Sequence, residues 1–336
     1  MPHLEQSSKL DLLRYVAKWG ALATVVATLA GSASALFLFA LDWATQTREA
    51  NRWLIWGLPV AGFCVGWLYL KFGQRVEAGN NLLIDEIHDP QKVVPLRMAP
   101  LVLGGTVISH LFGASVGREG TAVQMGGALA DQLTHLFRLG HVDRRMVLMA
   151  GISAGFASVF GTPLAGAVFA LEVLAIGRMR LDALLPCVIA AVVMWGSFDR
   201  YIGLGIPVMV EAFAHPLAPT DFLGKMVFTI ASLGSGFKGG EVTPLFYIGA
   251  TLGNALAPLL DVPFALLAAV GFVAVFAGAA NTPIASTLMA MELFGAEIGV
   301  FAALACVMSY VCSGHSGIYR AQRVAHRKTD APSQPS

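Results

Sequence analysis

The sequence is poor in charged residues, and this shortage narrows the class of protein. Only 13% of its 336 residues are charged, whereas 56% are hydrophobic. A soluble domain carries roughly 25% charged residues, so a surface that faces water on all sides is excluded. The net charge is +1, and no basic patch alternates with aromatic residues, which argues against nucleic acid as a partner.

Cysteine is also scarce, and its positions argue against metal or redox chemistry. The four cysteines lie in apolar stretches without the spacing of metal ligands: Cys64, Cys187, Cys306 and Cys312. We interpret them as small packing residues and expect no metal and no cofactor. Glu119, Glu241 and His315 could act as acid–base groups of a membrane-embedded enzyme, but no nucleophile is paired with a base. We therefore expect that the chain is not an enzyme.

Long apolar runs predict an all-α integral membrane protein. They cover residues 19–41, 53–70, 184–196 and 265–280. Each is long enough, or nearly so, to cross a hydrocarbon core of about 30 Å. Basic residues flank the two ends of the apolar region: Lys9, Arg14 and Lys18 before it, and Arg320, Arg323, Arg327 and Lys328 after it. The positive-inside rule then predicts that both termini are cytoplasmic.

The chain contains an internal repeat. Residues 151–172 return as residues 271–292, so that Glu172 corresponds to Glu292. Two homologous membrane halves are typical of transporters with inverted repeats, in which broken helices meet near the bilayer midplane. The predicted organisation is a cytoplasmic segment (1–18), a first repeat (19–198), a second repeat (199–323) and a disordered cytoplasmic tail (324–336).

Glycine-rich breaks interrupt the apolar sequence at residues 79–81, 113–120, 203–207 and 234–240. Free N–H groups at a helix start carry partial positive charge and can bind an anion. The alternative is that these glycines only permit close helix packing. Packing does not explain why polar residues occupy matching breaks in the two halves.

Glu119 is the first candidate site residue. It lies beside Arg118 in the break Gly117-Arg118-Glu119-Gly120, and an ionisable residue within a membrane span indicates function. Burial favours the neutral form of a carboxylate, so Glu119 could bind a proton and release its place at a helix start to an anion. The alternative is an ion pair between Arg118 and Glu119, which the poor facing of adjacent helical side chains disfavours.

Further candidates lie in the other breaks and near the end of the chain. The N–H groups of residues 240–243 and the Thr243 hydroxyl could donate to the same anion, and Glu241 is a second candidate proton carrier. Glu241 could instead pair with Lys238 at the membrane surface. Asn80 could direct its amide into the pore or act as a helix N-cap. Tyr319 offers a hydroxyl, although a lone tyrosine is also typical of the membrane interface.

These motifs together resemble one known family. G-R-E-G at 117–120, G-L-G-I-P at 203–207, G-F-K-G-G-E-V-T-P at 236–244 and the late Tyr319 resemble the CLC family of anion channels and proton-coupled exchangers. The chain is most similar to the fluoride-exporting branch, because G-N-N-L-L replaces the G-S-G-I-P of chloride-type members and Thr121 replaces a proline. The resemblance covers residues from about 19 to 323.

The resemblance implies a function and a role for each residue. It implies a homodimer in the bacterial inner membrane, with helices around 150–195 and 285–312 at the interface, that exports fluoride in exchange for protons. Glu119 would be the gating glutamate and Glu241 a candidate for proton coupling. The implied anion site comprises Asn80, Gly117, Arg118, Val242, Thr243 and Tyr319. Chloride/proton exchangers carry an inner glutamate where this chain has Val173, so that proton route is closed.

The second half of the chain is shorter than the internal repeat requires. Between residues 183 and 203 there is room for one crossing, whereas the first half holds two long spans before its first break. We predict that about two helices are missing near residues 195–200. The alternatives to fluoride exchange are a chloride or other small-anion channel or exchanger of the same fold, an inactive deletion variant, or a regulatory subunit that pairs with an intact copy.

Overall fold

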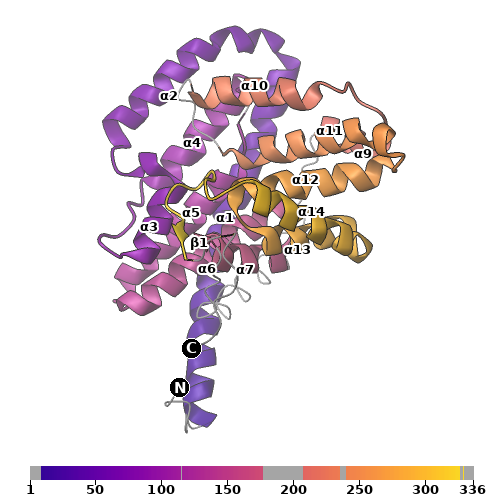
Figure 1. Ribbon diagram of the computed structural model, residues 1–336. Coiled ribbons are helices and arrows are strands. Elements are labelled where there is room, and N and C mark those ends of the chain that lie inside the picture. The colour runs from indigo at the N-terminus through magenta and orange to yellow at the C-terminus, as the bar shows by residue number, and fades with distance from the viewer. Residues whose placement is uncertain (1–8, 115, 177–206, 235–239, 326–327, 329–336) are drawn as a thin grey trace.

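The chain folds almost entirely into helices (Figure 1). The computed structural model describes residues 9–114, 116–176, 207–234, 240–325 and 328. The helices of the first half are α1 (Lys9–Ala50), α2 (Leu58–Phe72), α3 (Asn80–His88), α4 (Met98–Leu111), α5 (Glu119–Leu136), α6 (His141–Phe160) and α7 (Pro163–Glu172). Those of the second half are α9 (Pro207–Ala214), α10 (Asp221–Gly234), α11 (Val242–Leu260), α12 (Phe264–Ala280), α13 (Pro283–Phe294) and α14 (Gly299–Cys312).

Short elements complete the described chain. They are three 3₁₀ turns, Arg52–Gly57, Val76–Ala78 and Ala296–Ile298, and two strands, β1 (Ala175–Ile176) and β2 (Arg323–Val324). β1 and β2 pair in parallel. This pairing brings the end of the chain back to the segment that follows α7.

Apolar helices confirm the prediction of an all-helical membrane protein. Among the described residues, two segments are long and apolar enough to cross a bilayer, Arg14–Ala50 and Val242–Leu260. The predicted run 265–280 coincides with α12, whereas the run 53–70 divides into a 3₁₀ turn and α2. A proline at the start of α2 fits this division, because it begins a helix well and cannot continue one. The run 184–196 and the break 203–206 lie outside the described residues.

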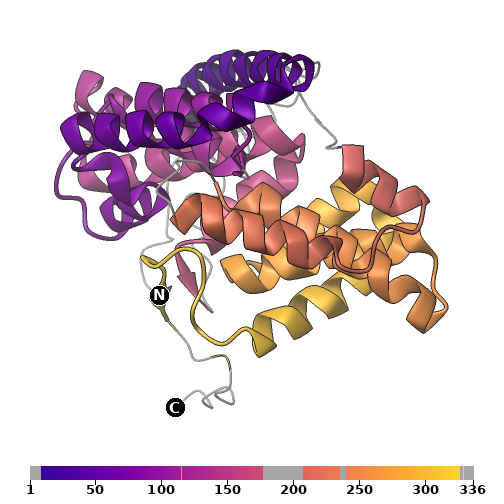
Figure 2. The ribbon, with the colours of Figure 1, turned by 90° about the horizontal axis from the view of Figure 1, so that it is seen from above.

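The two halves form two groups of helices that lie side by side (Figure 2). Within each group one pair packs especially closely, α5 against α6 and α11 against α12. A Cβ atom on Gly126 would lie 2.3 Å from the carbonyl oxygen of Gly151, and one on Gly249 would lie 2.2 Å from that of Gly271. Both pairs therefore require glycine for close packing, which is the packing role that small residues have in membrane helices.

The turn that ends each close pair repeats as well. Gly161 ends α6 with φ 71°, and Asn281 ends α12 with φ 57°. Asparagine is one of the few residues with a side chain that visit this left-handed conformation routinely. A Thr-Pro pair then starts α7 and α13 in the same way, so the predicted repeat is a structural repeat.

Two carboxylates establish that the repeats run in opposite directions. Glu172, at the end of α7, accepts hydrogen bonds from the N–H groups of Ile284 and Ala285 at the start of α13, at 3.2 and 2.9 Å. Glu292, near the end of α13, accepts them from Leu164 and Ala165 at the start of α7, at 3.0 and 2.8 Å. Each helix therefore ends where the other begins. The two helices are antiparallel, as inverted repeats require.

The structure adds detail within the two terminal segments of the predicted organisation. α1 begins at Lys9, within the segment 1–18 that was predicted to precede the membrane part. β2 includes Val324, at which the disordered tail was predicted to begin. The Lys328 ammonium donates to the Asn281 side chain at 2.5 Å and to the Tyr310 carbonyl at 2.6 Å. The sequence did not reveal these contacts because they depend on where α12 and α14 end.

Candidate functional site

Gly117, from the break at 113–120, and Gly240, from the break at 234–240, meet where α5 and α11 begin. Gly117 and Gly240 form an antiparallel backbone pair, in which Gly240 donates to the Gly117 carbonyl at 2.7 Å and Gly117 donates to the Gly240 carbonyl. A Cβ atom on Gly117 would lie 2.5 Å from the Gly240 carbonyl oxygen, so this approach needs glycine. Gly117 was predicted to contact an anion. In this conformation its N–H group joins the two halves instead.

The Glu119 carboxylate lies at the start of α11. The side chain is 1% exposed and accepts hydrogen bonds from the Thr243 N–H at 3.0 Å and from the Thr243 hydroxyl. The N–H group of Arg118 donates to the same carboxylate at 3.1 Å. The buried carboxyl group is thus held by donors at two helix starts, one from each half of the chain.

Arg118 also forms the ion pair that was considered as an alternative. Its Nε atom lies 3.6 Å from a carboxylate oxygen of Glu119. The expectation that adjacent side chains would not face each other was wrong, because Arg118 is the N-cap residue and precedes the first helical residue. The ion pair and the contact with Thr243 coexist, so one interpretation does not displace the other.

Asn80 is the first residue of α3 and does not act as the N-cap. The N-cap residue is Gly79, with φ 59°, and no side chain caps this helix start. The Asn80 Oδ1 atom is buried and has no hydrogen-bond partner among the described residues. Its amide lies close to Gly120, because a Cβ atom on that glycine would be 3.3 Å from Asn80 Nδ2. Asn80 is therefore directed toward the start of α5.

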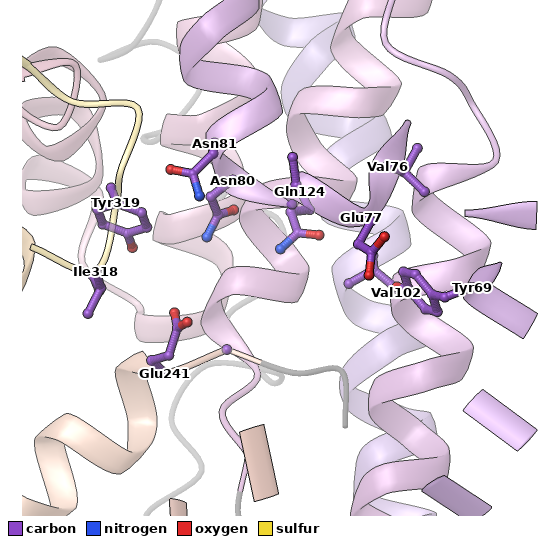
Figure 3. A pocket seen from close by; sticks show the side chains of 13 residues that line it. Tyr69, Val76, Glu77, Asn80, Asn81, Val102, Gln124, Glu241, Ile318 and Tyr319 are labelled. Carbon is purple, nitrogen blue, oxygen red and sulfur yellow. The ribbon is translucent and has the colours of Figure 1, made fainter. Parts of the chain in front are cut away.

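A polar cavity of about 210 Å³ lies beside these helix starts (Figure 3). Asn80 lies between Tyr319 and Gln124 in this view, and Glu241 reaches into the same space. Exposed Glu77 and Ala78 line the mouth. The full lining is Tyr69, Val76, Glu77, Ala78, Gly79, Asn80, Asn81, Val102, Gln124, Gly240, Glu241, Ile318 and Tyr319.

Other predicted residues surround this cavity. Tyr319 is 5% exposed and packs against Phe169, with ring centroids 6.2 Å apart, so it is a buried tyrosine and not an interfacial one. Val242 is buried in the core beside the site. Lys238, the alternative partner of Glu241, lies outside the described residues. Val173 lines a small apolar space together with Asn80 and Tyr319.

Sequence reasoning missed the three residues with polar side chains that line the cavity outside the predicted breaks, Tyr69, Glu77 and Gln124. Gln124 is a polar residue in an otherwise apolar stretch of α5, and Glu77 and Tyr69 flank the break before Asn80. The signal for Gln124 was its position five residues after Glu119, on a helix whose start was already a candidate. Glu77 and Tyr69 gave no comparable signal, because they come together only through the turn between α2 and α3.

Asn81 supports the site without contributing a ligand. Its Oδ1 atom accepts a hydrogen bond from the N–H group of Ala321 at 2.9 Å. This bond ties the segment that carries Tyr319 to the start of α3. Two predicted residues that are 239 positions apart, Asn80 and Tyr319, are therefore positioned by one short link between their neighbours.

A buried ion network holds the other end of α3. The Arg144 guanidinium contacts Asp131 at 2.7 and 2.8 Å and Glu86 at 3.1 Å, and all three residues are at most 5% exposed. It also donates to the carbonyl of Lys92 at 2.9 Å. Asp131 accepts from the N–H group of Val94 at 2.6 Å. The network therefore joins α3, the segment after it, α5 and α6.

Comparison with known proteins agrees with this arrangement. The family model described as voltage gated chloride channel matches residues 61–202 and 194–314. The chain belongs to this family, the CLC family. Its members are channels and transporters, so the chain is a multi-pass membrane transport protein and not an enzyme. His315, the third group of the enzyme alternative, does not line the cavity.

Individual relatives extend this result. A chloride/fluoride channel protein of Pseudomonas syringae pv. tomato is 58% identical over 416 aligned residues, which cover 99% of this chain and 92% of the relative. The crystal structure of a CLC-type fluoride/proton antiporter is 31% identical, with a TM-score of 0.87 over 95% of this chain and 100% of that one. A slow cyanobacterial Cl⁻/H⁺ antiporter shares the fold, with a TM-score of 0.70 at 18% identity over 91% of this chain and 96% of that one.

The alignment also bears on the missing segment. Its 416 positions exceed the 336 residues of the chain by 80, so the relative has residues that this chain lacks. A shortened chain agrees with the predicted loss of about two helices. The predicted place of the loss, near residues 195–200, lies outside the described residues.

Proposed function

We propose that this chain exports fluoride in exchange for protons across the bacterial inner membrane, with both termini in the cytoplasm. The observation that carries the proposal is the position of Glu119. Its carboxylate is buried and accepts hydrogen bonds from three donors, the Thr243 N–H, the Thr243 hydroxyl and the Arg118 N–H. A small anion would need the same donors, so the carboxylate and the anion compete for one place.

Exchange follows from this competition. A deprotonated Glu119 occupies the start of α11 and excludes the anion. When the carboxyl group binds a proton, its attraction to the helix start weakens and the side chain can leave. An anion can then take the vacated donors, and the return of the deprotonated side chain releases it. The carboxyl group therefore carries protons and gates the anion with one side chain.

The residues around Glu119 favour fluoride over chloride. Fluoride is a small, strongly hydrated hydrogen-bond acceptor. Its transfer from water into the protein therefore requires several short hydrogen bonds that replace those to water. We propose that the Asn80 amide, the Thr243 hydroxyl and the Tyr319 hydroxyl provide them, with Val242 shaping the site. Both the Pseudomonas syringae relative and the similar antiporter structure carry fluoride in their names.

The proton route is proposed to use the polar cavity. Val173 and the apolar space beside it offer no acidic group at the position where chloride exchangers carry one. Glu241 lines the cavity together with Tyr319 and Asn80 (Figure 3). We therefore assign Glu241 as the second proton carrier, between the cavity and the helix starts.

A fluoride efflux assay on the purified chain in liposomes tests the proposal. Fluoride-loaded vesicles should release fluoride with accompanying proton uptake, and an imposed pH gradient should shift the fluoride reversal potential. A reversal potential that ignores the pH gradient would identify a channel. Chloride efflux at the same rate as fluoride efflux would overturn the selectivity.

A second candidate is an inactive deletion variant. It is favoured by the relative's additional residues, because helices that normally cover the backbone breaks would be absent. This candidate predicts no efflux above that of empty liposomes. If grafting the corresponding segment of the Pseudomonas syringae relative restores efflux, the loss is due to the deletion. If the grafted chain still shows no efflux, the transporter function of this site is rejected.

A further inference from the structure

A second cavity lies at the junction of α5 and α6, away from the proposed pore. Its volume is about 630 Å³. Lys92, His135, Arg138 and His141 line it, and we call this space the basic cavity. None of the nine described residues that line it is acidic. The basic cavity therefore places the charged groups of Lys92 and Arg138 beside two imidazole rings, with no carboxylate among the described residues that line it.

The cationic side chains of the basic cavity are not used elsewhere in the described structure. Lys92, His135, Arg138 and His141 are exposed, and within the described residues none of their side chains forms an ion pair or a hydrogen bond. The nearby acidic groups already have partners. Asp131 and Glu86 pair with Arg144, Asp143 pairs with Lys18 at 2.5 Å, and Asp89 accepts from Gln91 at 2.9 Å. Within the described residues, no carboxylate is therefore paired with Lys92 or Arg138.

The backbone adds to this charge. α6 begins at His141 on the wall of the basic cavity and runs for 20 residues, so the positive end of its dipole faces this region. Arg144, which is 5% exposed, forms the inner wall through a guanidinium held by Asp131 and Glu86. The inner wall of the cavity is thus a buried, ion-paired guanidinium, and its rim consists of exposed basic side chains.

Apolar residues beside the basic cavity distinguish a lipid from a soluble anion. Leu136, Phe137 and Val142 are next to the lining residues in sequence and are 72%, 51% and 66% exposed. In a membrane protein such residues contact acyl chains, whereas Lys and Arg at helix ends reach the headgroups. Lys18, at the start of α1, pairs with Asp143 and places the cavity on the side that the positive-inside rule assigns to the cytoplasm.

We propose that the basic cavity binds the phosphate headgroup of an anionic phospholipid in the cytoplasmic leaflet. Lys92 and Arg138 provide the charges, and the α6 start provides N–H donors. The exposed side chains of Leu136, Phe137 and Val142 contact the acyl chains of the same phospholipid. Basic pockets between membrane helices on the cytoplasmic side are suited to such headgroups.

Native mass spectrometry of the purified full chain with added lipids tests this proposal. Phosphatidylglycerol should bind more tightly than phosphatidylcholine with matched acyl chains. In the double variant Lys92→Gln/Arg138→Gln, the affinity for phosphatidylglycerol should fall roughly 20- to 30-fold, since each cation near a headgroup contributes about a fivefold effect. Both residues are exposed, so the variant should retain the elution profile of the unmodified chain.

A matched control removes two charges elsewhere. Lys71→Gln/Arg97→Gln makes the same charge change at exposed positions outside the basic cavity, and its affinity for phosphatidylglycerol should stay unchanged. An equal loss in both double variants would overturn the proposal in favour of general surface charge. Displacement of phosphatidylglycerol by an equal concentration of inorganic phosphate would overturn it in favour of a soluble anion. Equal affinity for phosphatidylglycerol and phosphatidylcholine would contradict the proposed headgroup site.

Discussion

At the scale of single residues, the site brings donors from both halves to one carboxylate. Thr243 contributes its N–H and hydroxyl groups from the second half, and Arg118 contributes its N–H from the first. Hydrogen bonds to a charged group are worth about 1.5–3 kcal/mol, so a carboxylate with these partners is firmly held until it is protonated. Substitutions at Glu119 and at Thr243 therefore test different parts of the proposal.

Glu119→Gln should uncouple fluoride movement from protons. The amide resembles the protonated side chain in size and cannot release a proton, so it cannot complete the exchange. We expect the fluoride reversal potential to lose its dependence on the pH gradient. Glu49→Gln is the control, because Glu49 is exposed at the end of α1. Proton coupling that persists in Glu119→Gln would disprove the assignment of the gate.

Thr243→Val should weaken fluoride transport without disturbing α11. The change keeps the backbone N–H and the shape of the side chain but removes the hydroxyl donor. We expect fluoride efflux at low fluoride concentration to fall roughly tenfold, as for the loss of one hydrogen bond of about 1.5 kcal/mol to an anion. Thr251→Val is the matched control on the same helix, because the buried Thr251 hydroxyl bonds only to helix carbonyls. Equal efflux from both variants would contradict the role of Thr243.

At the scale of helices, α3 is held at both ends. The bond from Ala321 to Asn81 fixes its start, and the contact between Arg144 and Glu86 fixes its end. The same guanidinium binds Asp131 on α5. The position of Asn80 therefore depends on residues far from the cavity, which act by orienting a short helix.

Arg144→Met should destabilise the chain strongly. Removing the guanidinium leaves the buried Asp131 and Glu86 carboxylates without their main partner, and such a loss costs about 3–5 kcal/mol. Thermal unfolding in detergent should occur at a clearly lower temperature. Arg145→Met provides the comparison, because within the described structure the Arg145 side chain makes a single hydrogen bond, to the His88 carbonyl at 3.0 Å. A similar small decrease in both variants would show that the network is not a major source of stability.

At the scale of the whole molecule, α14 presents one apolar stripe to its surroundings. Val300, Leu304 and Met308 recur four residues apart and are 78%, 67% and 56% exposed. α14 and its neighbour α13 lie in or at the edge of the region 285–312, where the family resemblance implies a homodimer interface. α7, which packs against α13, lies in the other implied region, 150–195. We expect this stripe to contact a second copy of the chain.

Leu304→Trp should convert dimers into monomers. A bulky residue in the middle of a packed interface cannot be accommodated, whereas acyl chains adapt to it. Light scattering on the detergent-solubilised protein should report a dimer for the unmodified chain and a monomer for the variant. Leu36→Trp on α1, at a position that is 61% exposed, should remain dimeric. A dimer that persists in Leu304→Trp would place the interface elsewhere.

The sequence could predict the repeat and the site residues for different physical reasons. Thr162 and Glu172 correspond to Thr282 and Glu292 at one offset, so the repeat can be recognised from the order of residues alone. Glu119 and Asn80 were visible because polar groups in apolar helices are costly and therefore rare. Gln124 and Glu77 were not separated from ordinary polar residues, because their role depends on which helices face each other.

Composition, periodicity and the repeated motifs alone determined that this chain is a helical membrane protein with two related halves, and they identified the helix starts that we propose as the anion site. These properties depend on local sequence and on the exclusion of charge from lipid. Only the tertiary structure decided that the halves run in opposite directions, that Gly117 pairs with Gly240, and that Glu119 lies against Thr243. Such contacts join residues more than a hundred positions apart, and their geometry depends on how whole helices pack.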